Sequence, residues 1–222
     1  MHVKGSSHRV GARMAVLSTV VGAGLIVAVA TASPAVASPQ PGTATGATTV
    51  TLGGKAYNIL QSNGCGALVV SSANGVTWSV VPKGLKIIFP VSGVVTQPGN
   101  PAATRIDHSG SVTLENTCYA ITLANLRITN FGLPDQGSEF DLSALTKSAD
   151  DFGRQVVGVL DLSGANTVTT GNKTRISQMN LLTSDEGAEE LNELTVPGSD
   201  GSVGPFTAGQ KVGFAKTRVV IF

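Results

Sequence analysis

The sequence predicts an all-β fold: an antiparallel sandwich or a partly open barrel of about ten short strands, with one short helix near 184–193. Two observations predict it. Short runs rich in Val, Ile and Thr recur along the chain and are separated by turn signals made of Gly, Asn and Pro. The 27 glycines, together with the scarcity of Glu, Lys and Leu, also favour strands and turns over helices.

The first 37 residues are typical of an export signal. Lys4, Arg9 and Arg13 precede an apolar run over 14–32, and Ala35-Val36-Ala37 has the small-x-small pattern of a cleavage site. The run is near the lower length limit of a membrane span, so an uncleaved anchor is the alternative. We expect cleavage, a secreted or cell-wall-associated protein, and no stable membrane insertion afterwards.

Downstream of the signal, residues 38–47 are rich in Pro, Gly and Thr and predict a flexible linker. Residues 48–222 predict a single domain, because their length suits one and no repeat has a fixed period. From residue 38 onward, 12 Lys and Arg are interspersed with 14 Asp and Glu. A nucleic-acid or anionic-membrane partner requires a basic excess, so neither is expected.

The predicted elements follow from alternation and turn signals. Asn74-Gly75 predicts a hairpin turn between two strands. Pro90 indicates an edge position or a bulge within its strand, and Gly110 indicates a bulge within another. Ser184 is a suitable N-cap for the predicted helix. The predicted strands are 48–52, 56–61, 67–71, 76–81, 85–95, 104–114, 119–128, a segment with Phe140 and Leu142, 156–162 and 211–222.

Cys65 and Cys118 are the only cysteines. An even pair in an exported chain predicts one disulfide. The alternative, a thiolate or a zinc site, needs more ligands than two cysteines and one histidine provide, so no metal site is predicted.

His108 is the only histidine downstream of the signal. It could be a haem or metal ligand, the hydrogen-bond partner of such a ligand, or a general base. The alternative is structural: a half-buried histidine that shares a strand face with Ile106 and is bonded to a neighbour. Asp107 and Ser109 point to the opposite face, so they do not form a triad with His108, and the Gly-x-Ser-x-Gly nucleophile motif is absent. The sequence predicts a protein that is not an enzyme.

Four segments resemble a known family. They are Ile88-Phe89-Pro90-Val91-Ser92-Gly93, then Ile-Asp-His-Ser-Gly-Ser-Val-Thr-Leu over 106–114, then Ile-Thr-Leu-Ala-Asn-Leu-Arg-Ile over 121–128, and the closing Pro-Phe-x-x-Gly-x-x-Val-Gly-x-Ala over 205–215. Together they resemble secreted β-rich proteins of actinobacteria related to the HtaA (haem-transport-associated) domain.

This resemblance implies an exported all-β domain that captures haem through a tyrosine assisted by a histidine. His108 occupies the matching histidine position. The family's Trp-Gly…Ser-Phe-Arg-x-Tyr segment is not reproduced, and Tyr57 is the only tyrosine in a comparable place. His108 and Tyr57 are therefore the candidate ligand-binding residues, with haem as the candidate cofactor.

The predicted function is a secreted, non-enzymatic binding module that captures haem or another apolar ligand, with cell-wall or haem-uptake components as partners. The alternative is a structural or interaction protein of the cell surface that has no small-molecule ligand.

Overall fold

A computed structural model describes residues 40–97, 100–129, 139–147 and 152–222. The expected signal over 1–37 and the first two residues of the expected linker lie outside the described residues. The described residues fall in one compact unit, Val36–Phe222.

The described chain consists mostly of strands, with two short helices, which confirms the all-β class. Its elements are β1 (Gln40–Gly42), β2 (Ala44–Gly53), α1 (Gly54–Gln61), β3 (Val69–Ala73), β4 (Thr77–Val81), β5 (Gly84–Gln97), β6 (Asn100–His108), β7 (Ser111–Glu115), β8 (Ala120–Thr129), β9 (Glu139–Lys147), β10 (Phe152–Asp161), β11 (Asn166–Thr170), β12 (Lys173–Leu182), α2 (Asp185–Glu193) and β13 (Lys211–Ile221).

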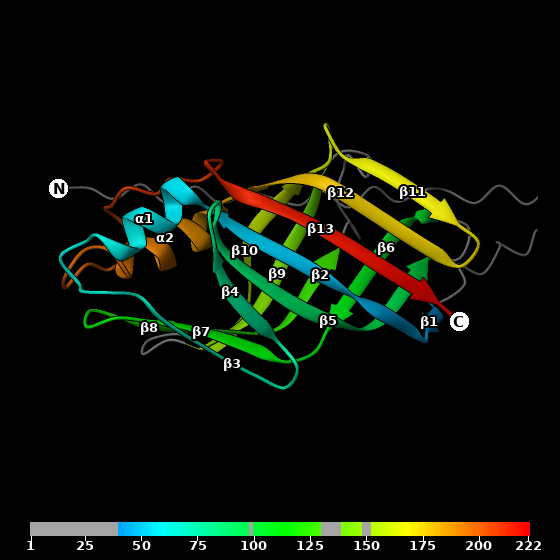
Figure 1. Cartoon of the computed structure of the whole chain (residues 1–222), viewed down its shortest axis with the longest axis horizontal. Coiled ribbons are helices and arrows are strands. Elements are labelled where there is room, and N and C mark those ends of the chain that lie inside the picture. Colours follow the sequence, from blue (N-terminus) through cyan, green and yellow to red (C-terminus); the bar gives the residue numbers. More distant parts are fainter. Residues whose placement is uncertain (1–39, 98–99, 130–138, 148–151) are drawn as a thin grey trace, which may run out of the picture. The chain divides into compact units, whose positions relative to one another are not determined.

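The described strands belong to one sheet in which their pairings are antiparallel. Its main order is β1-β5-β2-β13-β12-β10-β9-β8-β7-β3. β6 pairs with both β5 and β8, while β4 pairs with β5 and β11 with β12. Strands β2, β13 and β12 lie side by side, and the two helices lie together near one end of them (Figure 1).

Alternation along the central strands gives the sheet one apolar face and one polar face. Val50 on β2, Phe89 on β5 and Ala215 on β13 are buried in the hydrophobic core. Lys216 and Arg218, on the opposite face of β13, are exposed. The strands that surround the core therefore also carry an outer polar surface.

The linker predicted over 38–47 is wrong from residue 40 onward. β1 pairs with β5, and residues 44–47 pair with β13, from Ala44 opposite Ile221 to Ala47 opposite Arg218. Although the segment is rich in Pro, Gly and Thr, its backbone pairs with neighbouring strands, so the segment is part of the sheet.

The strand predicted over 56–61 is also wrong, because this segment forms the helix α1. Ala56 and Leu60 are its buried residues, and their spacing of four places them on one helical face. The second helix agrees with the prediction: Ser184 is its N-cap, and the Ser184 hydroxyl accepts a hydrogen bond from the Gly187 N–H at 2.9 Å.

The bulge indicated by Pro90 is present, because the β5–β6 register shifts between Val91 and Gly93. The segment 104–114 is not one bulged strand. It divides into β6 and β7 around Gly110, whose φ of +85° is a turn conformation. His108 is thereby the last residue of β6. Neither helix of the described chain has the length and apolarity that crossing a membrane requires.

Candidate functional site

His108 lies in the core, where both of its ring nitrogens are hydrogen-bonded. Its exposed fraction is 3%. Nδ1 lies 2.9 Å from the Leu126 carbonyl oxygen on β8, and Nε2 lies 2.7 Å from Oγ1 of Thr48 on β2. Thr48 Oγ1 is in turn 2.9 Å from Oγ1 of Thr217 on β13. The imidazole of β6 is therefore connected to three other strands of the sheet.

The chemistry of these partners sets the protonation of His108. A carbonyl oxygen only accepts, so Nδ1 carries the proton and donates it to Leu126. Nε2 is then unprotonated and accepts a hydrogen bond from the Thr48 hydroxyl, which accepts one from Thr217. Burial lowers the pKa of His108 to about 4, although the Leu126 carbonyl and the Asp107 charge act in the opposite direction. At neutral pH the ring is uncharged.

Tyr57 lies on α1 and is half-buried against the hydrophobic core. Its hydroxyl accepts a hydrogen bond from Nε2 of Gln61, one turn later, at 2.9 Å. Gln61 Nε2 also donates to the Leu68 carbonyl at 3.3 Å. The polar atoms of Tyr57 and His108 thus bond to different neighbours, and the structure does not bring the two predicted residues together through a hydrogen bond.

The contacts of His108 do not fit coordination of a haem iron by its imidazole ring. To reach an iron atom, His108 would have to give up one of its two hydrogen bonds, which would leave the Leu126 carbonyl without its imidazole donor or the Thr48 hydroxyl with Thr217 as its remaining partner. An unpaired buried polar group costs about 1–3 kcal/mol. The geometry supports the structural interpretation of His108.

An apolar cavity of about 80 Å³ lies between the apolar face of the sheet and α2. Val50, Phe89 and Leu126 line it from the strands, and Gly187 and Leu191 line it from α2. Sequence reasoning missed this cavity, because its wall comes from elements distributed over the whole domain. Such an apolar space favours apolar ligand groups over water.

One carboxylate reaches this cavity. Glu190 of α2 lines it with only 9% of its surface exposed. The Tyr119 hydroxyl donates a hydrogen bond to Oε2 of Glu190 at 3.2 Å. In the sequence, Glu190 is one of several acidic residues of the predicted helix, and only its distance along the chain from Gly187 and Leu191 distinguishes it from the others. That spacing from Gly187 and Leu191 places all three on the helix side facing the sheet.

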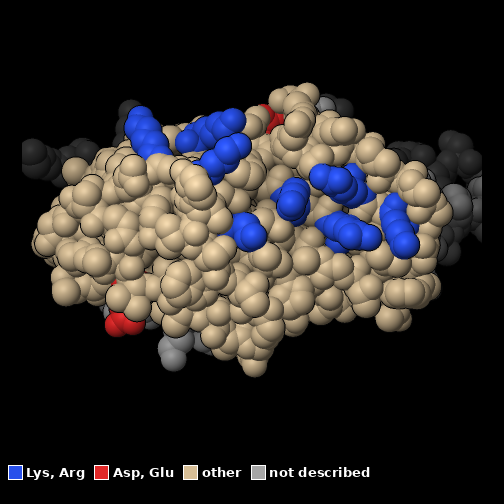
Figure 2. All heavy atoms as spheres, viewed as in Figure 1, with Lys and Arg blue, Asp and Glu red and all other residues tan. Residues whose placement is uncertain are grey.

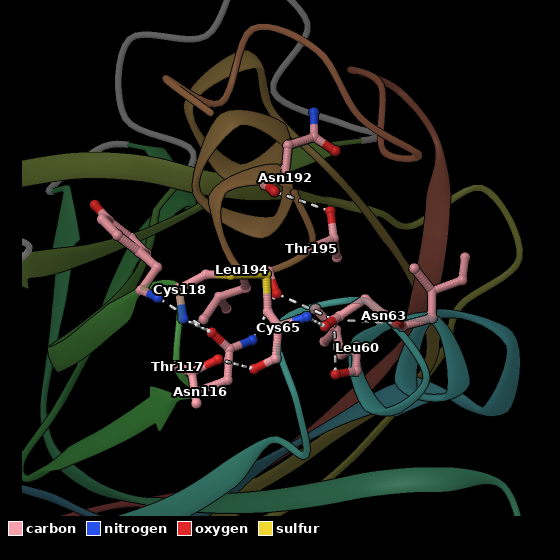
Figure 3. Close-up of a disulfide and its surroundings, with 11 residues drawn as sticks. Leu60, Asn63, Cys65, Asn116, Thr117, Cys118, Asn192, Leu194 and Thr195 are labelled. Carbon is pink, nitrogen blue, oxygen red and sulfur yellow. Dashed lines mark hydrogen bonds between the residues drawn. A yellow bond between two sulfur atoms is a disulfide. The ribbon is translucent and has the colours of Figure 1, made fainter. Parts of the chain in front are cut away.

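The predicted disulfide between Cys65 and Cys118 is present, and it closes a sequence separation of 53 residues. Figure 3 shows it within a cluster of asparagine side chains next to the end of α2. Asn63 and Asn116 each donate to the Leu194 carbonyl, at 3.1 and 2.6 Å. The disulfide and these amides join both flanking loops to the helix that covers the cavity.

No group of three or more His, Cys, Asp or Glu side chains is arranged to hold a metal ion within the described ranges. The two ion pairs among these residues both involve Asp107, which bonds Arg105 and Arg127 at 3.0 and 2.8 Å. Asp107 therefore belongs to a partly exposed cluster on the face opposite the His108 ring.

Comparison with known proteins relates the chain to others by fold. No protein-family model matches it, and no curated protein matches it. The crystal structure of the C-terminal domain of HtaA from Corynebacterium glutamicum is similar, with a TM-score of 0.59, 16% identity, and coverage of 82% of this chain and 100% of that one. The heme binding protein HtaB from the same organism has a TM-score of 0.50 and 13% identity, with 83% and 96% of the two chains covered. The chain thus has the fold of the HtaA C-terminal domain, and the resemblance inferred from the sequence is confirmed at the level of the fold.

Proposed function

We propose that this chain is a non-enzymatic binding module that takes an apolar group of its ligand into the cavity beneath α2. The observation that carries the proposal is the wall of this cavity, which consists almost entirely of Val, Leu, Ile and Phe side chains. A site of this kind binds by burying apolar surface, at about 25 cal/mol per Å².

The state of His108 supports binding over catalysis. A general base needs an ionisable group poised near the working pH and within reach of a reacting proton. His108 has a pKa of about 4, is almost fully buried, and is bonded to a carbonyl and a hydroxyl. Its role is to hold strands together around the ligand-binding core.

The likeness in fold supports the same class of function, because one of the similar structures is described as a heme binding protein. For this chain the two hydrogen bonds of the His108 ring favour a ligand that is held without His108 as an iron ligand. The Cys65–Cys118 disulfide supports a site of action outside the cytoplasm, where disulfides persist. We therefore propose a secreted or cell-wall-associated module.

The first test titrates the protein with fatty acids of increasing chain length and follows the heat of binding. Val157→Trp inserts a large side chain at the cavity wall, whereas Val69→Trp makes the same change at a site that is 60% exposed and outside the cavity. We expect binding by the wild type and by Val69→Trp, and at least a tenfold loss in Val157→Trp. Equal binding by both variants would refute the cavity as the site.

The second test uses hemin. The Soret band of the mixture is compared for the wild type, His108→Ala and Tyr57→Phe. We expect the same Soret band for the wild type and for His108→Ala, because both ring nitrogens of His108 are occupied by hydrogen bonds. A band that changed only in Tyr57→Phe would assign the iron to Tyr57. A Soret shift that is lost in His108→Ala would overturn the structural interpretation of His108. If neither fatty acids nor hemin bind, the alternative of a cell-surface interaction protein without a small ligand replaces the proposal.

A further inference from the structure

A groove of about 850 Å³ runs over the outer face of the sheet, where β11 and β12 meet β13 and β2. It lies on the opposite side of these strands from the cavity. On β2, Val50 points into the cavity, while Ala47 and Thr49 line the groove. The groove is therefore a second, separate surface feature.

Lysine and arginine side chains line the groove in two rows. Lys173 and Arg175 lie two residues apart on β12, and Lys216 and Arg218 lie two residues apart on β13. All four are exposed. The strand register places Arg175 directly opposite Arg218. Figure 2 shows Lys and Arg side chains gathered over this part of the molecule, with Asp and Glu almost absent from the same view.

Among the described residues that line the groove, none is acidic and able to balance these charges. Among all the residues that the structure describes, the two ion pairs found are those of Asp107, and neither of them includes a cation of the groove. Like charges directly opposite each other on neighbouring strands destabilise a sheet, so the Arg175–Arg218 pair lowers stability in the absence of an anion. A bound anionic ligand would remove this repulsion.

We propose that the groove binds a linear polyol-phosphate chain, that is, a polymer of polyols joined by phosphodiester groups. Side chains two residues apart on one strand are separated by roughly 7 Å. Successive phosphates joined by a short polyol can match this repeat. The two rows of cations can then contact consecutive phosphates. Each arginine guanidinium can donate two parallel hydrogen bonds to the oxygens of one phosphate.

The remaining lining of the groove fits the polyol units. Thr49, Thr170 and Ser177 contribute hydroxyls, and Asn166 and Gln178 contribute amides, all of which can donate to or accept from sugar-like hydroxyl groups. The apolar side chains in the described lining are aliphatic and offer no aromatic ring on which a base could stack. A polyol phosphate therefore suits the groove better than a single-stranded nucleic acid.

The test measures binding of a synthetic glycerol-phosphate oligomer by calorimetry at several salt concentrations. In Arg175→Ser/Arg218→Ser we expect at least a tenfold weaker affinity and a salt slope reduced by about one to two. The matched control is Lys55→Ala/Lys83→Ala, which removes two exposed cations outside the groove. We expect its affinity to stay within twofold of the wild type.

The arginine variant relieves a like-charge pair, so we expect it to fold and to unfold at a temperature no lower than that of the wild type. Three results would overturn the proposal: no binding at low salt, equal losses in the two double variants, or tighter binding of polygalacturonate or oligothymidylate than of the glycerol-phosphate oligomer. Because the groove and the cavity lie on opposite faces, failure here leaves the fatty-acid test unaffected.

Discussion

Nε2 of His108 lies 2.7 Å from Oγ1 of Thr48, a residue 60 positions earlier in the chain. This hydrogen bond joins the end of β6 to the centre of β2. Thr48 and Thr217 have exposed fractions of 0% and 2%, so the group of three side chains is sealed from water. Burial keeps the imidazole uncharged at neutral pH, so Nε2 accepts a hydrogen bond from the Thr48 hydroxyl.

The buried state of His108 predicts that stability falls as the pH is lowered from about 6.5 to 4. In the unfolded chain His108 titrates with its ordinary pKa of 6.5, whereas in the folded protein its pKa is about 4. The unfolded state binds the proton first as pH falls, so unfolding becomes more favourable. The full effect is about 3 kcal/mol, present above pH 6.5 and lost by pH 4. Urea denaturation at pH 7.5, 5.5 and 4.5 measures it.

The control for this prediction is His108→Gln, which removes the titrating group and keeps a side chain able to donate and accept. We expect the variant to be less stable at pH 7.5 and to lose less stability than the wild type down to pH 4.5. An unchanged pH profile in the variant would show that the dependence comes from the carboxylates instead.

Removal of the Cys65–Cys118 disulfide should destabilise the protein by about 4 kcal/mol. On the chain-entropy model this is the value for a loop of the observed separation of 53 residues. Guanidinium denaturation of the wild type and of Cys65→Ser/Cys118→Ser gives the difference. The reduced wild type should behave as the double variant does; a loss below about 1 kcal/mol would mean that the asparagine contacts to Leu194 hold these loops without the disulfide.

The strands were predictable because alternation is a local signal. On β8, Ile121 and Ile128 are buried on the core side, and the change of phase between them coincides with the register shift between Ala124 and Arg127. Asn125, within that shift, has a φ of +48°, which breaks the regular pleat. A period of two in the sequence and its interruption are both visible without the structure.

The helix α1 was not predictable from the same signals. It begins at Gly54, its N-cap Gly53 forms no side-chain cap bond, and its first turn has no acidic residue. Tertiary packing of Ala56 and Leu60 on the core overrides these weak local preferences. The spacing of Tyr57 and Gln61, which are four apart and hydrogen-bonded, is the sequence feature that could have indicated a helix.

The sequence also could not show which polar groups meet. The two partners of His108 lie 18 and 60 residues away, so its structural role depends on strand pairing. Charges that are interspersed along the sequence become segregated in space for the same reason. Arg175 and Arg218 are brought together only by the β12–β13 register.

We predict that replacing Asn192, near the end of α2, lowers the stability of the fold. Its amide donates to the carbonyls of Gly201 and Phe206 at 3.1 and 3.0 Å, and its Oδ1 accepts from the Phe206 N–H at 2.9 Å. Asn192→Ala leaves these buried groups unpaired and should cost about 3 kcal/mol. Asn58→Ala, at an exposed site on α1, should stay within about 0.5 kcal/mol. Thermal unfolding compares them, and equal shifts in melting temperature would refute the role of the buried amide.

Gly187 allows the first turn of α2 to approach β10 directly. A Cβ atom at this position would lie 2.0 Å from the Val157 carbonyl oxygen, a distance that requires the helix or the strand to move. Helix propensity alone favours Ala over Gly by about 1 kcal/mol, so an unconstrained Gly187→Ala would stabilise α2. Here the steric conflict prevails, and we expect a loss of about 1–3 kcal/mol by urea denaturation. Gly164→Ala is the control, because a Cβ there meets no atom within 4 Å. If Gly187→Ala proved as stable as Gly164→Ala, α2 would have room to move away from β10. The close contact between Gly187 and Val157 would then not fix the size of the cavity that both residues line.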